Sequence, residues 1–119
     1  MKNISVIKVK SMKVSELCGE IGARIITLPD GEREINGAYC GDLLSWVMGR
    51  ATSGNVWITI MSNINVVAVA SLADTACVLL AEGVELEEDV KSTAQSKGIN
   101  VLSSDKSAYE LCSVLSGLI

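Results

Sequence analysis

The chain of 119 residues contains no histidine and no phenylalanine, and it has only one proline, two tryptophans and two tyrosines. Without histidine, Ser-His-Asp and Cys-His catalysis, histidine-ligated metals and a histidine proton shuttle are all excluded within this chain. No apolar run approaches the roughly 20 residues that a membrane-spanning helix needs. Aliphatic residues supply most of the 49% apolar fraction, which together with 20% charged residues is typical of a folded cytoplasmic domain.

Basic residues are few outside the N-terminus. Four of the ten lysines and arginines fall within residues 1–13, which contain no acid. From Val14 onward, six bases face fourteen acids. A surface of that sign repels phosphate backbones, so we expect neither nucleic-acid binding nor association with a membrane surface.

The cysteines do not form a recognisable motif. Cys18, Cys40, Cys77 and Cys112 are far apart, none belongs to a C-x-x-C pair, and each has apolar neighbours. We therefore expect reduced core residues. A disulfide pair or a metal site is the alternative, but structural zinc needs clustered cysteine or histidine ligands, and we expect no metal and no cofactor.

The chain divides into a short N-terminal segment and one domain. Residues 1–11 alternate weakly between polar and apolar positions and contain no turn signal, which fits an N-terminal extension or an edge strand. Residues 12–119 then alternate between strand-like and helix-like patterns. We expect strands over residues 23–27, 35–40, 56–60, 76–80 and 99–102. Helices are expected over residues 15–21, 42–49, 66–73, 87–97 and 107–115.

Strands separated by helices of these lengths imply right-handed crossovers. The predicted fold is therefore a three-layer α/β/α domain with a mostly parallel sheet. Asp42 is expected to cap the second helix, and either Asn63 or Asn65 the third. Ser107 and Glu110 have the spacing of a capping box at the last helix.

The helix predicted over residues 66–73 is apolar on every side, so it must be buried on every side. One explanation is contact with a second copy of the chain, which makes a homodimer the expected assembly. The other is burial between the sheet and neighbouring helices, and both remain open here. The residues of the predicted interface are Val66, Val67, Val69, Ala70 and Leu72.

Polar residues gather where the predicted parallel strands end. Ligands tend to bind at this edge of such sheets, where hydroxyls, amides and free N–H groups of helix starts can hold a small anion. The same residues also suit caps and turns, and neither G-x-G-x-x-G nor a P-loop is present. The candidate ligand-binding residues are Asp42, Ser62, Asn63, Asn65, Gly83, Ser103, Ser104, Asp105 and, as the only base, Lys106.

Four segments together resemble a known family. They are VSELCGEIGARIIT, INGAYCGDLLSWVMGRA, VWITIMSNINVVAVASLADTACVLLAEGV and GINVLSSDKSAYELCSVL. Over residues 12–119 the chain resembles the stand-alone DRTGG-domain proteins. The Asp-Arg and Thr-Gly-Gly elements that name the family are absent as such. The segment near the first element is Ser62-Asn63-Ile64-Asn65. The segment near the second is Ala81-Glu82-Gly83, in which only Gly83 agrees with the family.

The resemblance implies an α/β domain like the N-terminal domain of HPr serine kinase and the DRTGG domain of CBS-domain pyrophosphatases. It also implies a regulatory or dimer-forming module, with the chemistry supplied by other domains. The first functional hypothesis is accordingly a non-catalytic regulatory or dimerisation module that partners a kinase or another enzyme. The second is a sensor of a nucleotide or phosphometabolite, with Asp42 and Asp105 as acids and Lys106 as the anion contact. A catalytic role is not expected, because no pair of ionisable residues has a diagnostic spacing.

Overall fold

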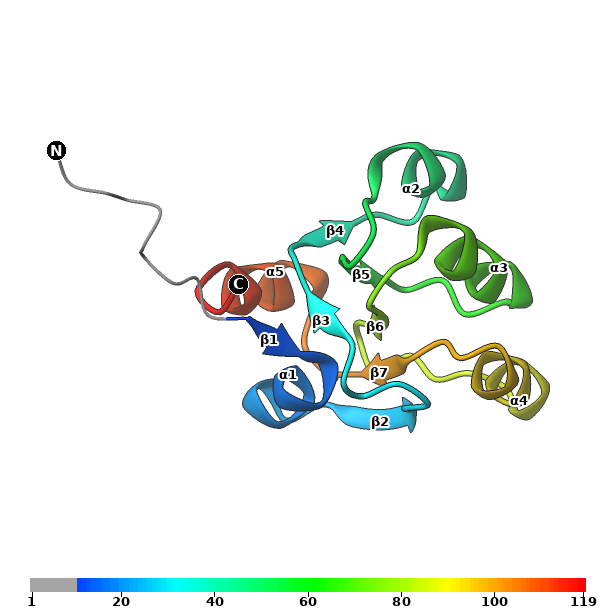
Figure 1. The fold of residues 1–119 in the computed structure, drawn as a ribbon, viewed down its shortest axis with the longest axis horizontal. Helices are drawn as coiled ribbons and strands as arrows, with labels where there is room; N and C mark the ends of the chain where they lie inside the picture. The colour runs from blue at the N-terminus through cyan, green and yellow to red at the C-terminus, as the bar shows by residue number, and fades with distance from the viewer. Residues whose placement is uncertain (1–10) are drawn as a thin grey trace, which may run out of the picture.

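Residues 11–119 are described by a computed structural model, shown in Figure 1. Apart from Ser11, the predicted extension or edge strand over residues 1–11 lies outside the described residues. The elements are β1 (Met12–Lys13), α1 (Val14–Ile21), β2 (Arg24–Thr27), β3 (Glu34–Ile35), β4 (Ala38–Cys40), α2 (Leu44–Arg50), β5 (Val56–Thr59), α3 (Ile64–Ala73), β6 (Cys77–Leu80), α4 (Glu88–Ser96), β7 (Val101–Ser103) and α5 (Ala108–Ser116).

A five-stranded mixed sheet forms the middle layer. Its strand order is β2-β7-β6-β5-β4, in which β4 to β7 are mutually parallel and β2 runs antiparallel to β7. Helices α2, α3 and α4 cover one face, while α1 and α5 cover the other (Figure 1). The predicted three-layer α/β/α fold with a mostly parallel sheet is confirmed.

The central strands are apolar on both faces because both faces are covered. Trp57 and Val78 point toward α2, α3 and α4, whereas Ile58 and Leu79 point toward α1 and α5. All four side chains are fully buried. This alternation produces two cores, one on each side of the sheet, and explains why β5 and β6 read as continuous apolar runs.

The strand predicted over residues 35–40 is in fact two strands. β3 pairs with β1 in a separate two-stranded sheet, whereas β4 pairs with β5. The break falls at Asn36 and Gly37, where Gly37 has a φ of 131° that a residue with a Cβ rarely adopts. Apolar residues stand on both sides of this Asn-Gly pair, and the sequence was therefore interpreted as a single strand.

Two of the predicted caps are present. The Asn63 side chain accepts a hydrogen bond from the Asn65 backbone N–H over 2.9 Å, which makes Asn63 the N-cap of α3. Ser107 and Glu110 form the predicted capping box of α5. The prediction for Asp42 is wrong, since the N-cap residue of α2 is Leu43 and no side chain caps that helix.

Helix α3 packs on the sheet between α2 and α4, as Figure 1 shows. Four residues of the predicted dimer interface, Val66, Val67, Val69 and Ala70, are already buried by this packing. Leu72 is the remaining one, and 72% of its surface is exposed. Burial within the chain therefore explains most of the apolar character of α3, and the homodimer remains a prediction.

Candidate functional site

The carboxyl edge, as we call the edge where strands β4 to β7 end, begins at Asp42 after β4. The Asp42 carboxylate accepts hydrogen bonds from Thr59 Oγ1 over 2.6 Å and from the Ile60 N–H over 3.1 Å. Thr59 Oγ1 accepts in turn from the Met61 N–H. Asp42 thus joins the loop after β4 to the loop after β5. Its Oδ1 therefore accepts hydrogen bonds from the loop after β5, in place of the predicted helix cap.

The loop after β5 borders a hollow of about 340 Å³ together with the start of α4. Ser62 and Asn63 line it on one side, and Glu87 and Asp89 on the other. The carboxylates of Glu87 and Asp89 would repel a phosphate that enters this hollow. Asn63 is also engaged in capping α3. This part of the edge therefore suits a neutral or cationic group better than the predicted anion.

The loops after β6 and β7 are hydrogen-bonded to each other. The N–H of Glu82 donates to the carbonyl of Lys106, and the N–H of Gly83 to the carbonyl of Ser104, each over 2.8 Å. The N–H of Lys106 donates to Ser104 Oγ over 3.2 Å. These backbone groups satisfy one another. A ligand at this place would meet the exposed side chains of Asp105 and Lys106 before any free N–H group.

Arg24 is the residue of this edge that the sequence interpretation missed. It begins β2, which runs antiparallel to its neighbour and so starts at the edge where the parallel strands end. Its guanidinium donates to Asp105 over 3.0 Å, to Glu85 over 3.1 Å and to Ser103 Oγ over 3.1 Å. The hydrogen bond to Asp105, followed by that to Glu85, raises the pKa of the Arg24 guanidinium. Lys106 is therefore not the only base here.

The predicted site residues fall into three groups along the edge. Gly83 and the segment 103–106 form one loop pair, Ser62, Asn63 and Asn65 belong to the start of α3, and Asp42 is bound to Thr59. Within residues 11–119, no group of three or more acidic, cysteine or histidine residues is placed to hold a metal ion.

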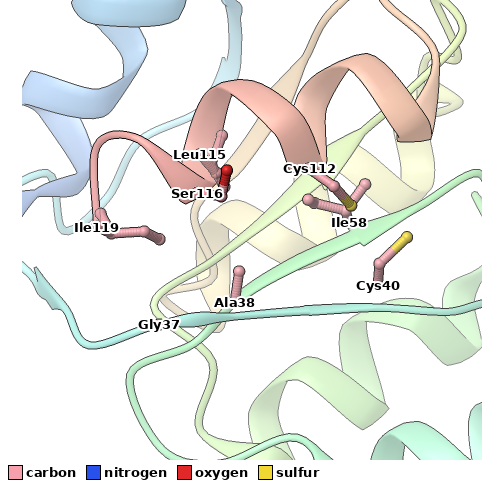
Figure 2. A pocket seen from close by; sticks show the side chains of 8 residues that line it. All are labelled: Gly37, Ala38, Cys40, Ile58, Cys112, Leu115, Ser116 and Ile119. Carbon is pink, nitrogen blue, oxygen red and sulfur yellow. The ribbon is translucent and has the colours of Figure 1, made fainter.

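A second hollow lies on the opposite face of the sheet, between the edge strand β4 and α5 (Figure 2). We call it the α5 groove. Its volume is about 330 Å³, and its lining residues are Gly37, Ala38, Cys40, Ile58, Cys112, Leu115, Ser116 and Ile119. No charged side chain belongs to this lining, so the groove is unsuited to a phosphate. Sequence patterns do not predict it, because its walls come from segments far apart in the chain.

The cysteines differ in exposure. Cys18 and Cys77 are buried, Cys112 is half-buried and Cys40 is exposed. The prediction that all four are core residues is therefore wrong for Cys40, which lies on the edge strand β4 where no further strand covers it within the described structure. All four are free thiols.

None of the helices in residues 11–119 is long and apolar enough to cross a membrane. A comparison with curated protein sequences gives no match. Among solved structures, the fold is similar to a crystal structure of the CBS and DRTGG domains of the regulatory region of Clostridium perfringens pyrophosphatase, complexed with the activator diadenosine tetraphosphate.

That similarity has a TM-score of 0.63 at 9% sequence identity, which shows a common fold. It covers 79% of this chain and 41% of the pyrophosphatase chain, so the two proteins match over less than half of the pyrophosphatase chain's length. The sequence profile of the DRTGG domain matches residues 16–118, in agreement with the resemblance seen in the four segments. Because the match spans nearly the whole chain, this protein belongs to the DRTGG domain family.

Proposed function

We propose that this chain is a non-catalytic regulatory module that acts in the cytoplasm as a homodimer and alters the activity of a partner enzyme. Membership of the DRTGG family and a structural neighbour that is part of a regulatory region support the regulatory role. The observation that carries the proposal of a homodimer is a row of exposed apolar side chains on α2 and α3.

This row, the α2/α3 surface, consists of Leu43, Trp46, Ile64, Ala68 and Leu72. Ile64, Ala68 and Leu72 are spaced four residues apart, so they share one side of α3, where they line a shallow hollow with Thr93 and Lys97 beside α4. Leu43 and Trp46 lie at the start of the neighbouring helix α2 and are about half exposed. Several large apolar side chains exposed in the same helical layer of a small domain are typical of an interaction surface.

A second copy suits this surface because a two-fold axis doubles every contact. In such an interface each residue of the surface is used twice, once in each subunit. Burying one leucine side chain contributes roughly 2 kcal/mol. Leu72 and its symmetry mate therefore supply a large share of the affinity, and a charge at this position penalises the dimer twice.

Sedimentation or light scattering at micromolar concentration tests this proposal. We expect a dimer for the natural chain and monomers for Leu72→Glu and Trp46→Glu. Tyr109→Glu is the matched control, because Tyr109 is 84% exposed but lies on α5 across the sheet. It should leave the dimer intact. A monomeric natural chain, or a dimer that survives both α2/α3 variants, contradicts the proposed assembly.

The second candidate function is a sensor of a nucleotide or phosphometabolite. The observation that favours it is the pair of cationic side chains at the carboxyl edge, Arg24 at the start of β2 and Lys106 in the loop after β7. The structurally similar regulatory region of the pyrophosphatase was crystallised with its activator, diadenosine tetraphosphate. This supports a nucleotide as the ligand. Exchange of Asp105 for a phosphate as the partner of Arg24 would free the loop 103–106 to move.

A thermal-melt screen with mono- and dinucleotides and sugar phosphates tests the sensor. The melting temperature should rise with one ligand class, and Lys106→Ala combined with Arg24→Gln should remove that rise. Lys91→Ala is the control, since Lys91 is on α4 and has a weak contact with Glu88 at 4.0 Å. No shift across the panel, or a shift that the double variant retains, contradicts binding at these loops.

A further inference from the structure

Cys40 and Cys112 bring two thiols together at the α5 groove. Cys40 is on the edge strand β4 and Cys112 on α5, so they are far apart in the sequence and meet only through the fold. Figure 2 shows their sulfur atoms directed toward each other across the groove. Both thiols line the same groove, and Cys112 is near enough to help raise the pKa of the Cys40 thiol. Cys40 is exposed and Cys112 half-buried, so solvent reaches this pair.

The other two cysteines form a contrasting pair within the same protein. Cys18 and Cys77 both belong to the core between the sheet and helices α1 and α5. Burial, followed by the proximity of Cys18, raises the pKa of the Cys77 thiol to about 12. A thiol that is buried and protonated neither meets an oxidant nor reacts with it. Reactivity is therefore confined by the structure to Cys40 and Cys112.

We propose that Cys40 and Cys112 are a redox site in which a peroxide or a small disulfide converts the two thiols into a reversible intramolecular disulfide. This site lies on the face of the sheet opposite the α2/α3 surface, and Cys40 ends β4 two residues before Asp42 of the carboxyl edge. Intracellular proteins in which disulfides do form generally use them for catalysis or redox sensing. Such a site would let a regulatory module respond to oxidants directly.

The α5 groove supplies the space that bond formation needs. A disulfide requires the two Cα atoms to lie within about 7 Å and the sulfur atoms at about 2.05 Å. The volume of about 330 Å³ between β4 and α5 leaves room for the two sulfur atoms to approach each other. The groove lies along the C-terminal half of α5, which contributes Cys112, Leu115 and Ser116 to its lining.

The reaction balances with hydrogen peroxide as the oxidant. The Cys40 thiolate attacks one peroxide oxygen, the O–O bond breaks, and hydroxide leaves to become water after taking a proton. Cys112 then attacks the sulfenic sulfur of Cys40, forming the S–S bond and releasing a second hydroxide, which also becomes water. The two thiols together lose two protons and two electrons, and one peroxide is reduced to two waters. A thiol reductant restores both thiols.

The environment of Cys40 makes this reaction slow at neutral pH. Burial, followed by the facing Cys112 and then Asp42, raises the pKa of the Cys40 thiol to about 11. Because the thiolate is the reactive form, its fraction below that pKa grows about tenfold for each unit by which the pH rises. Oxidation by peroxide and exchange with disulfides both use the thiolate, so both rates should increase from about pH 7 to pH 9.

The disulfide would tie the last helix to the edge of the sheet. β4 has only β5 as a partner in its sheet within the described residues, and α5 is the last helix of the chain. A bridge between them closes a long loop, which restricts the unfolded chain and raises the melting temperature by about 5 °C or more. It also narrows the α5 groove from its open side.

Treatment of the purified chain with hydrogen peroxide, followed by intact-mass analysis and peptide mapping, tests the proposal. We expect a species without an interchain cross-link, lighter by about 2 Da, with one cross-linked peptide pair containing Cys40 and Cys112. Dithiothreitol should restore the original mass. Cys18 and Cys77 should become alkylated only after unfolding, which provides an internal control on the same sample.

Two variants separate the site from general oxidation. Cys40→Ser is at an exposed position and should fold normally, and it should lose both the 2 Da change and the increase in melting temperature. Cys112→Ser should behave in the same way. Oxidation that yields sulfinic acid alone, a cross-link between two chains, or a bridge that includes Cys18 or Cys77 would overturn the assignment.

Discussion

Arg24 donates a hydrogen bond from Nη1 to Asp105 Oδ1 over 3.0 Å, although the two residues are 81 positions apart. The antiparallel pairing of β2 with β7 brings them together, because Arg24 stands opposite Ser103 in the register. Glu85 completes the group from the loop after β6. One guanidinium thus links an edge strand to two loops of the carboxyl edge.

Arg24→Gln should lower the midpoint of urea unfolding by a small but measurable amount, since exposed ion pairs contribute little singly and more as a network. The loss should shrink in high salt, because salt screens exposed charges. Urea denaturation at two salt concentrations measures both effects. Lys91→Gln removes an ion pair of 4.0 Å within α4 and should have no measurable effect. A loss for Arg24→Gln that is unchanged in high salt contradicts the electrostatic explanation.

Gly83→Ala should destabilise the chain more than Gly22→Ala. Both glycines have positive φ, 72° and 64°, where a Cβ costs about 1 kcal/mol. A Cβ on Gly22 meets no atom within 4 Å, whereas one on Gly83 lies 3.0 Å from Asp105 Oδ1. Gly22→Ala therefore measures the backbone cost alone, and the excess for Gly83→Ala measures displacement of Asp105.

That excess should disappear in the Arg24→Gln background, since Asp105 is then free to move away. A double-mutant cycle on urea midpoints gives this coupling. If both glycine variants lower the free energy of unfolding equally in the natural background, the loop after β7 adjusts at no energetic cost. Arg24 then does not hold Asp105 in place.

Substitution of Asn100 should destabilise the fold more than substitution of most other polar residues. It is buried, its Nδ2 donates to the carbonyls of Asp30 over 2.7 Å and Ala76 over 3.0 Å, and its Oδ1 accepts from the Asp30 N–H over 2.9 Å. Asn100→Ala leaves these groups unsatisfied and opens a cavity, at a cost of about 2–4 kcal/mol.

Asn100→Asp should cost at least as much as Asn100→Ala, because a carboxylate facing two carbonyl oxygens is repelled by both. Asn65→Ala is the matched control on the exposed side of α3 and should change stability by less than about 0.5 kcal/mol. Chemical denaturation of the three variants measures the differences. A cost for Asn100→Ala similar to that of the control would refute the role of its hydrogen bonds.

The fold was largely predictable because its elements are marked by local signals. Continuous apolar runs indicated β5 and β6, and caps at Asn63 and Ser107 indicated the starts of α3 and α5. The break at Gly37 was missed because apolar residues continue on both sides of it. The cap at Asp42 was wrong because Thr59 and Ile60, distant in sequence, compete for the same carboxylate.

The site was less predictable because it depends on which strands are neighbours. Arg24 looks like an ordinary residue of an edge strand until the antiparallel direction of β2 is known. The same holds for Cys40 and Cys112, whose proximity arises from the packing of α5 on the sheet. An antiparallel edge strand can in principle be inferred from a short turn, but the segment 28–33 between β2 and β3 does not reveal its partner.

Asp74 should make stability depend on pH in the acid range. It follows α3 with a φ of 57°, and its carboxylate accepts hydrogen bonds from Arg33 Nη1 over 3.0 Å and from Ser53 Oγ. The bond from Arg33, followed by that from Ser53, lowers the pKa of Asp74. The unfolded chain therefore binds its proton at a higher pH than the folded chain.

The contribution of Asp74 to stability is accordingly complete above its unfolded pKa of about 3.9 and is lost as the pH falls through the lower folded value. Asp74→Asn keeps a side chain that tolerates positive φ but removes the charge. Its cost should be about 0.5–1 kcal/mol near neutral pH, a modest value because the carboxylate is largely exposed.

The difference between the natural chain and Asp74→Asn should narrow progressively as the pH falls below about 4. Urea denaturation across this range measures it, and acid effects common to both chains cancel in the difference. In the Arg33→Gln background most of the pH dependence should disappear, because the largest cause of the lowered pKa is gone. A difference that stays constant, or grows, as the pH falls contradicts the pairing of Asp74 with Arg33.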